Sequence, residues 1–406
     1  MTKTVTGKGV FKAQNFIDQQ LTEIRRALGK ERAVIACSGG VDSTTCAVLT
    51  RRAVGENLVC VFIDTNFMRL EEPEKVFKML SEPPLELPVR LLSAKNRFMK
   101  ALRGLEDAEK KRKAFRDIFY SILCEAAKEE NCHFLVQGTI LPDILETVKG
   151  IKTQHNVLDQ MKIDTRKAYG FKLIEPLVSL YKSQVREVAR CLAIPLEASE
   201  RQPFPGPGLS VRVVGKITPA KLDIEKAATK IVEERLEKLQ PKQFFPAIID
   251  SNKVEYPKAE KMEKALKSLL RGKEVSVDIH TLQTRATGIL AGHRLYGKIV
   301  AVSVQDLDKR CLELPLKTFE SIRKKITDED KEVSRVLYRL IDQEKRGKWI
   351  IAIRAVETLD FVQAAVSDVP WSLLKEIAEQ IENSYDAVSA VYYDITSKPP
   401  ASIEFE

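Results

Sequence analysis

The sequence predicts an α/β chain in which a parallel sheet with helices on both faces precedes an α+β domain of two repeated units. Three observations support this prediction. Short apolar runs alternate with helical stretches as far as Val136, polar and glycine-rich segments follow directly after the apolar runs, and a C-terminal segment recurs 55 residues further along the chain. Strands that alternate with helices of this length form parallel sheets, which bind ligands at the carboxyl ends of their strands.

The N-terminal elements follow from the spacing of apolar residues. Ile17, Ile24 and Leu28 recur at helical spacing, so a helix is expected over 16–28. The apolar run 33–37 is short and stops at a serine and two glycines, which is typical of a buried strand. The same reasoning predicts further helices over 42–52, 71–80, 95–103 and 107–130, and strands over 58–63, 89–92 and 133–136.

A domain boundary is expected at Pro203–Gly208, because three prolines and two glycines in six residues extend neither a helix nor an inner strand. We therefore assign residues 1–208 to the sheet domain and 209–406 to the repeat domain. The two copies of the repeat are placed at about 275–341 and 342–406.

The repeat itself predicts strand, helix, strand in each copy. Pro315–Ile322 aligns without gaps to Pro370–Ile377, and Val333–Tyr338 aligns to Val388–Tyr393. One such unit buries its sheet only against helices or a second sheet, so the two copies are expected to pack together. Only the second copy continues into a polar tail, 397–406, which suggests that one copy carries a site; a frayed terminus is the alternative.

Composition restricts the class of protein without choosing a function. The chain has 406 residues, of which 44% are hydrophobic and 30% charged, so it has the apolar material for folded cores. It lacks an apolar run of the ~18 residues that a membrane helix needs, and it lacks a secretory signal. A cytoplasmic protein that does not bind membranes is therefore expected. The net charge of +9 favours anionic ligands in general.

The seven cysteines are scattered and form no C-x-x-C pair. Neither a zinc site nor a redox motif is therefore indicated. We expect these thiols to act as small apolar side chains.

The strongest local signal is Ser38-Gly39-Gly40-Val41-Asp42-Ser43, which lies between a predicted strand and a predicted helix. Two glycines allow a tight turn whose backbone N–H groups face an anion, and the start of the helix adds its positive dipole end. Lysine is absent where a Walker loop requires it, and Asp42 stands in the loop instead. An acidic residue beside phosphates indicates a ligand for Mg²⁺. The alternative is an ordinary capped glycine turn.

This loop resembles the PP-loop of the ATP pyrophosphatases, and other segments are similar to the GMP synthetase family within that group. Asp64–Arg69 resembles V-D-N-G-x-x-R, and Gly138–Glu146 resembles G-T-x-x-P-D-x-x-E. The remaining similar segments are the lid Ile151–Asn156, the proline-rich Arg201–Leu209 and the C-terminal Tyr393–Glu406. The resemblance implies an adenine nucleotide alpha hydrolase-like fold for the first domain and a dimerisation-type second domain.

The resemblance also implies roles for individual residues. ATP is expected at Ser38, Gly39, Gly40, Val41, Asp42, Ser43 and Gly138, and XMP at Arg69, Asp143, Glu146, Lys398, Ile403 and Glu404. Asp42, Lys152 and Lys182 are the expected catalytic residues, with Asp42 as the Mg²⁺ ligand. The spacing of Asp143 and Glu146 places them on one helical face, and a solvated first turn is the alternative for that pair. For Lys152 and Lys182 the alternative is a surface lysine.

The sequence departs from the family pattern at three places. The lid has Thr153-Gln154 where the family has Ser-His, and Leu158–Met161 replaces Gly-Gly-Leu-Pro. Ser183 stands where an acidic residue follows the lysine. In the dimer-domain loop, Gly288–Tyr296 lacks the family aspartate.

The expected function is the synthetase half of a glutamine-hydrolysing GMP synthase, a ligase that forms a C–N bond. In that family ATP adenylates the C2 oxygen of XMP, and ammonia then displaces AMP. No glutaminase segment is evident in the chain, so a separate glutaminase subunit or free ammonia is expected. The paired repeats predict a monomer, with a homodimer as the alternative. Two other functions stay open: a pyrophosphatase that adenylates another substrate such as tRNA, although no RNA-binding pattern is evident, and a nucleotide-binding regulator without turnover.

Overall fold

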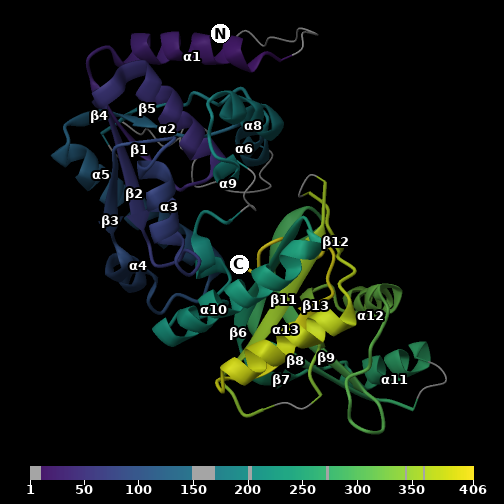
Figure 1. The fold of residues 1–406 in the computed structure, drawn as a ribbon. Coiled ribbons are helices and arrows are strands. Elements are labelled where there is room, and N and C mark those ends of the chain that lie inside the picture. The colour runs from purple at the N-terminus through teal and green to yellow at the C-terminus, as the bar shows by residue number, and fades with distance from the viewer. Residues whose placement is uncertain (1–10, 149–169, 200–203, 271–273, 343–344, 360–361) are drawn as a thin grey trace. The chain divides into compact units, whose positions relative to one another are not determined.

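A computed structural model describes residues 11–148, 170–199, 204–270, 274–342, 345–359 and 362–406 (Figure 1). The chain divides into two compact units. The N-terminal unit comprises Met1–Asn66, Glu71–Lys95 and Arg116–Gln202, and the C-terminal unit comprises Phe67–Leu70, Asn96–Phe115 and Pro203–Glu406. The two short segments 67–70 and 96–115 thus group with the C-terminal unit, although they precede the boundary that the sequence predicts near residue 208.

The N-terminal unit contains a five-stranded parallel sheet in the order β3-β2-β1-β4-β5. Its strands are β1 (Arg32–Ala36), β2 (Leu58–Asp64), β3 (Val89–Ser93), β4 (Cys132–Val136) and β5 (Lys172–Ile174). The helices that connect and flank them are α1 (Ala13–Leu28), α2 (Val41–Val54), α3 (Glu72–Ser81), α4 (Lys95–Leu102), α5 (Ala108–Glu129), α6 (Leu141–Val148), α8 (Lys182–Cys191) and α9 (Leu196–Ser199). The predicted fold class is confirmed.

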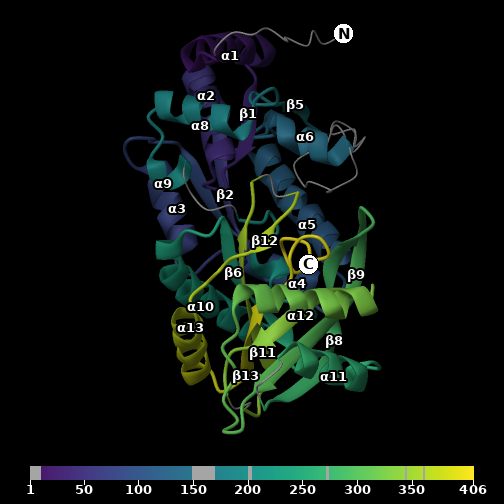
Figure 2. The ribbon, with the colours of Figure 1, turned by 90° about the vertical axis from the view of Figure 1, so that its right-hand side faces the viewer.

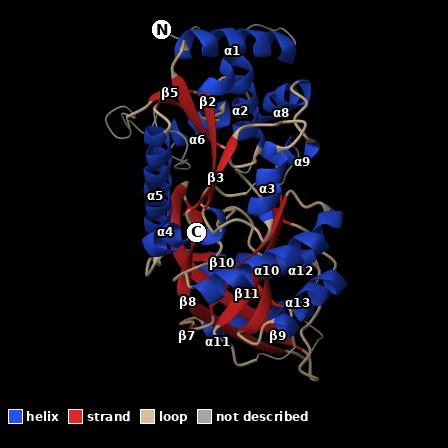
Figure 3. Cartoon of the chain, turned by 60° about the vertical axis from the view of Figure 1, so that its left-hand side comes forward, coloured by secondary structure: helices blue, strands red, loops and turns tan. Residues whose placement is uncertain are grey.

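The sheet is the core of this unit. All seven residues of β2 are buried, as its uninterrupted apolar sequence predicts for a central parallel strand. Helix α1 buries Ile17, Ile24 and Leu28 on one face, and α1, α2 and α8 pack against one another. Figure 3 shows α5 on the opposite side of the sheet from α2 and α8. Among the described residues, no helix is both long and apolar enough to span a membrane.

The strand order creates a switch point between β1 and β4. The chain runs outward from β1 through β2 to β3 and then returns to the other side of β1 to form β4 and β5. The loops that follow β1 and β4 therefore lie next to each other at the carboxyl edge of the sheet. In open parallel sheets this is the position at which ligands bind.

The C-terminal unit is built on a mixed sheet in the order β12-β11-β13-β10-β9-β8-β7, with β6 also paired to β11. Its strands are β6 (Gln243–Asp250), β7 (Lys253–Glu255), β8 (Ser276–Leu290), β9 (His293–Gln305), β10 (Val333–Arg339), β11 (Trp349–Glu357), β12 (Ala365–Val366) and β13 (Val388–Asp394). Its helices are α10 (Pro219–Leu236), α11 (Ala259–Leu269), α12 (Leu316–Glu329) and α13 (Trp371–Ser384), with α4 and the first residues of α5.

The two copies of the sequence repeat are related by an internal pseudo-twofold axis. In each copy two strands pair in parallel, β9 with β10 and β11 with β13, and a helix connects them. Strands β10 and β13 then pair antiparallel, with Tyr338 opposite Tyr393. Those two tyrosines are separated by the same 55 residues that separate the repeats, so the axis passes between them.

The symmetry extends further upstream than the sequence repeat. Strand β6 pairs antiparallel with β11 just as β8 pairs antiparallel with β9, and each follows a helix, α10 or α11. Helix α10 lies beside α13, and α11 lies beside α12 (Figure 2). Because α10 and β6 precede the whole first copy, that copy is inserted into the second rather than placed before it.

Candidate active site

The glycine-rich loop between β1 and α2 is held together by two serine hydroxyls. The Ser38 and Ser43 Oγ atoms lie 3.0 Å apart, and the Ser43 hydroxyl also donates to the carbonyl of Gly40 at 3.1 Å. The backbone N–H groups of Ser38 and Gly40 donate to the Ser43 and Ser38 hydroxyls respectively. The turn is therefore closed by its own side chains at the N-terminus of α2, where the first-turn N–H groups have no partner within the helix.

Two positions in and near the loop require glycine. Gly39 has φ of +76°, and a Cβ atom built there would lie 2.6 Å from a methyl carbon of Val76. Gly138, in the loop after β4, passes so close to α2 that a Cβ atom would lie 3.0 Å from the backbone of Asp42 and Ser43. The two loops at the switch point therefore approach each other backbone to backbone, which only glycine allows.

Asp42 and Lys182, both predicted to be catalytic, form an ion pair. Lys182 Nζ lies 2.6 Å from Asp42 Oδ2, with the lysine at the first residue of α8 and the aspartate in the first turn of α2. Oδ1 of Asp42 is buried and has no hydrogen-bond partner among the described residues. A carboxylate oxygen in that state suits an oxygen-seeking cation such as Mg²⁺.

The thiols around the loop are structural. Burial, with the nearby carboxylates of Asp42 and Glu175, raises the pKa of Cys46 well above its ordinary value. The neighbouring Cys60 thiol and burial do the same to the pKa of Cys37. Both thiols are therefore protonated at neutral pH, which is the state of a packing residue and not of a nucleophile.

The segment after Gly138 carries two more of the predicted residues. The Asp143 carboxylate accepts a hydrogen bond from the backbone N–H of Ile140 at 3.1 Å, so it fixes the start of α6. Glu146 lies one turn further on in the same helix, and its side chain lies outside the described residues. Lys152 and the rest of the predicted lid also lie outside them.

In the C-terminal unit, Arg69 is held by a carboxylate and an aromatic ring. Its Nε lies 2.7 Å from Glu233 Oε2, and its guanidinium lies 4.2 Å from the centre of the Phe204 ring. Phe204 belongs to the proline-rich segment, so that segment forms part of the wall around Arg69. Burial lowers the pKa of Arg69, although the residue stays charged.

Arg212 connects this wall to the C-terminal tail. Its Nε and one terminal nitrogen each lie 3.0 Å from a different oxygen of Glu404, and the guanidinium stacks on Phe245 at 4.0 Å. Gln243 donates to the same carboxylate at 3.2 Å. Glu404, predicted to contact XMP, thus has its carboxylate engaged by Arg212, while Arg69 is close enough for its charge to be felt by Glu404.

Below Arg212 lies a fully buried carboxyl group, Glu225 on α10. One of its oxygens has no hydrogen-bond partner among the described residues, and the other accepts a long 3.5 Å bond from Thr229. Burial raises the pKa of Glu225 well above its ordinary value, although the charge of Arg212 opposes this shift. The carboxyl group is therefore neutral in the folded protein.

Glu225→Gln is expected to match or exceed the wild-type stability at pH 8 and to lose this advantage towards pH 5. Folding raises the pKa of Glu225, so the wild type takes up a proton on folding and loses stability as pH rises above the unfolded value of about 4.5. Glutamine has the same shape and does not titrate. Urea unfolding from pH 5 to pH 8 measures the difference, with Glu234→Gln, an exposed glutamate on the same helix, as the control. A wild type that gains on the variant as pH rises would contradict the assignment.

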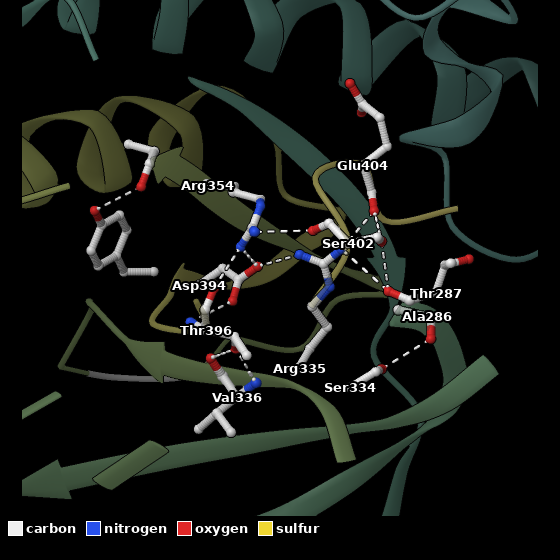
Figure 4. A network of polar contacts seen from close by, with 12 residues as sticks. Ala286, Thr287, Ser334, Arg335, Val336, Arg354, Asp394, Thr396, Ser402 and Glu404 are labelled. Carbon is white, nitrogen blue, oxygen red and sulfur yellow. Dashed lines mark hydrogen bonds and ion pairs between the residues drawn. The ribbon is translucent and has the colours of Figure 1, made fainter. Parts of the chain in front are cut away.

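The tail after β13 is fixed by a buried charge network (Figure 4). One oxygen of Asp394 accepts hydrogen bonds from both Arg335 and Arg354, at 2.8 and 2.7 Å, and all three side chains are fully buried. The arginines then bond tail atoms: Arg354 donates to the carbonyl of Ser402 at 3.0 Å, and Arg335 donates to that of Glu404 at 2.6 Å. The network therefore holds the backbone that carries the predicted XMP contacts.

The network exists on one side of the pseudo-twofold axis. The position equivalent to Asp394 is Arg339, and the position equivalent to Arg335 is Ala390. Strand register makes Ser303 equivalent to Arg354. The first copy thus lacks the carboxylate and both of its arginine partners, which is consistent with the prediction that one copy carries a site.

Lys398 lies where the tail crosses a neighbouring strand end. Its backbone N–H donates to Ala364 at 2.8 Å, and its carbonyl accepts from the same residue at 3.1 Å. Ile403 is partly buried. The described candidate residues therefore fall into two groups: Ser38–Ser43, Gly138, Asp143 and Lys182 in the N-terminal unit, and Arg69, Lys398, Ile403 and Glu404 in the C-terminal unit.

The structure adds residues that sequence reasoning missed. Val76 limits the loop at Gly39, and Glu233 positions Arg69 from 164 residues away. Neither has a local sequence signal, because each acts through a contact between distant segments.

The fold and the loop define the class of protein first. Residues 13–197 match the family described as PP-loop domain, and residues 340–405, which contain the second repeat and the tail, match the family described as GMP synthase C terminal domain. Among solved structures, NMN synthetase from Francisella tularensis aligns with 50% of this chain and 79% of its own, at 17% identity and a TM-score of 0.39.

Full-length relatives define the family. The chain is 41% identical to a subunit of the glutamine-hydrolyzing GMP synthase of Sulfurisphaera tokodaii and 38% identical to the subunit of the same name from Methanopyrus kandleri. Each match covers 98% of this chain and 100% of the relative. The chain therefore belongs to the family of these GMP synthase subunits.

Proposed function

We propose that this chain catalyses the ATP-dependent conversion of XMP and ammonia to GMP, AMP and pyrophosphate, as the synthetase subunit of a glutamine-hydrolysing GMP synthase. The observation that carries the proposal is the combination, in one family member, of a PP-loop at the sheet's switch point with a C-terminal tail held by a buried charge network. The first provides for a nucleoside triphosphate, and the second presents Lys398 and Glu404 for a purine monophosphate.

The reaction proceeds in two balanced steps. The C2 oxygen of XMP attacks the α-phosphorus of ATP and pyrophosphate leaves. Ammonia then attacks C2, AMP leaves with that oxygen, and a proton is lost to give the 2-amino group of GMP. Adenylation is needed because the oxygen is a poor leaving group until it carries AMP.

The residues of the N-terminal unit would bind and orient the triphosphate. The loop N–H groups and the start of α2 would receive its phosphates, where the helix dipole favours negative charge. Asp42 would hold Mg²⁺, which supplies positive charge to the departing pyrophosphate. Lys182, now paired with Asp42, is positioned by that pair to add its own charge to the same phosphates.

Ammonia would come from a separate glutaminase subunit. The relatives are named as one subunit of a glutamine-hydrolysing enzyme, which supports a partner of that kind. Purified alone, the chain is expected to use ammonium and not glutamine.

The test is the purified chain with ATP, Mg²⁺, XMP and ammonium, with GMP, AMP and pyrophosphate measured together. Equal amounts of the three products that depend on XMP are expected. Pyrophosphate release that depends on tRNA instead would favour an adenylating enzyme with another substrate. Binding of ATP and XMP without products would favour a regulator.

Gly39→Ala is expected to weaken ATP binding at least ~10-fold, because a left-handed backbone costs a side chain about 1–2 kcal/mol and the new methyl also contacts Val76. Adding Val76→Ala relieves the contact and not the backbone strain, so it should restore only part of the affinity. Gly29→Ala is the matched control, since Gly29 has φ of +57° and open space around it. Calorimetric titration with ATP gives the three values, and equal affinity in Gly39→Ala and wild type would contradict the loop assignment.

We also propose that the chain is a monomer, because its two repeats already pair with each other across the pseudo-twofold axis. A sedimentation mass near 45.8 kDa is expected. A mass of two chains would show instead that a second surface of the chain makes a homodimer.

A further inference from the structure

The last residue of the chain is buried, which is unusual for a terminus. The Glu406 side chain is fully buried and pairs with Lys111, which is also fully buried. Its other carboxylate oxygen accepts a hydrogen bond from the backbone N–H of Gly215 at 2.8 Å. Both oxygens of the terminal side chain are therefore satisfied by groups far away in the sequence.

The backbone of Glu406 is held as firmly as its side chain. Its N–H donates to the carbonyl of Val211 at 3.1 Å, and its carbonyl accepts a hydrogen bond from Arg112. One residue earlier, the carbonyl of Phe405 accepts from Thr287 at 2.7 Å, and the Phe405 ring is fully buried. The tail is thus anchored at its very end as well as at Asp394.

Lys111 is itself fixed by more than one contact. Its Nζ also donates to the carbonyl of Val213 at 2.8 Å. A second lysine, Lys221, is buried nearby and pairs with Asp250 at 2.9 Å. The two lysines and the two carboxylates balance in charge, so the anchor is a neutral group of buried ions.

Such a group is a costly way to gain stability alone. Removing two charges from water costs several kcal/mol per ion, and apolar residues of similar volume usually give an equal or greater gain. What ions provide is one register, because each oxygen must meet its donor. The anchor therefore fits a segment whose exact conformation matters.

We infer that Glu406 and Lys111 are positioning residues for the monophosphate substrate. Together they set the conformation of the tail 395–406, which presents Lys398, Ile403 and Glu404. Neither contacts the substrate. Glu404 lies two residues from the anchor, and its carbonyl is bonded by Arg335, so a shift of Glu406 displaces Glu404 first. This inference rests on the proposed function for its substrate, and on the contacts of the tail for its mechanism.

The test is Glu406→Gln, assayed separately for XMP and ATP. Glutamine keeps the shape and the acceptor for Gly215 and leaves Lys111 without its counter-charge. The KM for XMP is expected to rise at least ~10-fold, with the KM for ATP within about twofold of wild type and amide exchange in 395–406 about tenfold faster. Glu406→Asp, which restores the charge, should recover part of the XMP affinity.

Two further variants keep the inference falsifiable. If Glu406→Gln does not fold, the double variant Lys111→Met with Glu406→Gln removes both charges, and the same rise in the KM for XMP is expected. Asp330→Asn is the matched control, because Asp330 pairs with Lys298 at 3.0 Å in the same unit and lies outside the tail. It should leave both KM values unchanged.

The possible failures are distinct. Unchanged KM for XMP together with unchanged tail exchange in Glu406→Gln would overturn the inference and leave the proposed function standing. A wild type that forms no GMP would sink the proposed function instead. In that case exchange in 395–406 still decides the anchor, since faster exchange supports it and equal exchange refutes it.

Discussion

Asp42→Asn is expected to lower kcat for GMP formation at least ~100-fold, the size typical of losing one preorganised electrostatic contact to transition-state charge. The change removes the charge that would hold Mg²⁺ and leaves Lys182 without its carboxylate partner. Asparagine is nearly the same size, so the first turn of α2 should be retained. Initial rates of GMP formation at saturating ATP and XMP measure the effect.

The control for this variant is Asp18→Asn, an exposed aspartate on α1 in the same unit. It should leave the rate within about twofold of wild type. Raised Mg²⁺ should recover part of the Asp42→Asn rate, since a weaker ligand set needs more metal. Full activity in Asp42→Asn would remove Asp42 from the mechanism.

Asp394→Asn is expected to lower the free energy of unfolding of the C-terminal unit by about 3–5 kcal/mol, as breaking a buried ion pair does. Two fully buried guanidinium groups share that carboxylate, and burial together with Arg354 already lowers the pKa of Arg335 to about 9. Asparagine still accepts from the N–H of Thr396 but no longer balances either charge. Both tryptophans, Trp349 and Trp371, lie in this unit, so their fluorescence in a urea titration reports on it alone.

The matched control is Asp386→Asn, an exposed aspartate just before the same strand. It should change the free energy of unfolding by less than about 0.5 kcal/mol. Equal stability of Asp394→Asn and wild type would mean that the network does not hold the unit together as described.

The local features of the N-terminal unit could be predicted from the sequence because they depend on short patterns. The apolar run before Ser38 and the two glycines after it give the strand, the turn and the start of the helix without reference to distant residues. The parallel sheet follows from the alternation of strands and helices. The bounds of β1, β2 and α2 accordingly differ from the predicted ones by only one or two residues.

What could not be predicted depends on contacts between distant segments. The pairing of Arg69 with Glu233 spans 164 residues, and that of Lys111 with Glu406 spans 295. The insertion of the first repeat into the second was hidden because α10 and β6 share no obvious sequence similarity with α11 and β8. The roles of the candidate residues, including the lid lysine Lys152, stay predictions for the same reason: they require the substrate.

The most direct test of the account follows one oxygen atom. XMP labelled with ¹⁸O at the C2 oxygen is incubated with the purified chain, ATP, Mg²⁺ and ammonium, and the isolated AMP is weighed by mass spectrometry. If the chain adenylates XMP, one labelled oxygen appears in AMP for each GMP formed. GMP accompanied by unlabelled AMP would contradict adenylation of XMP.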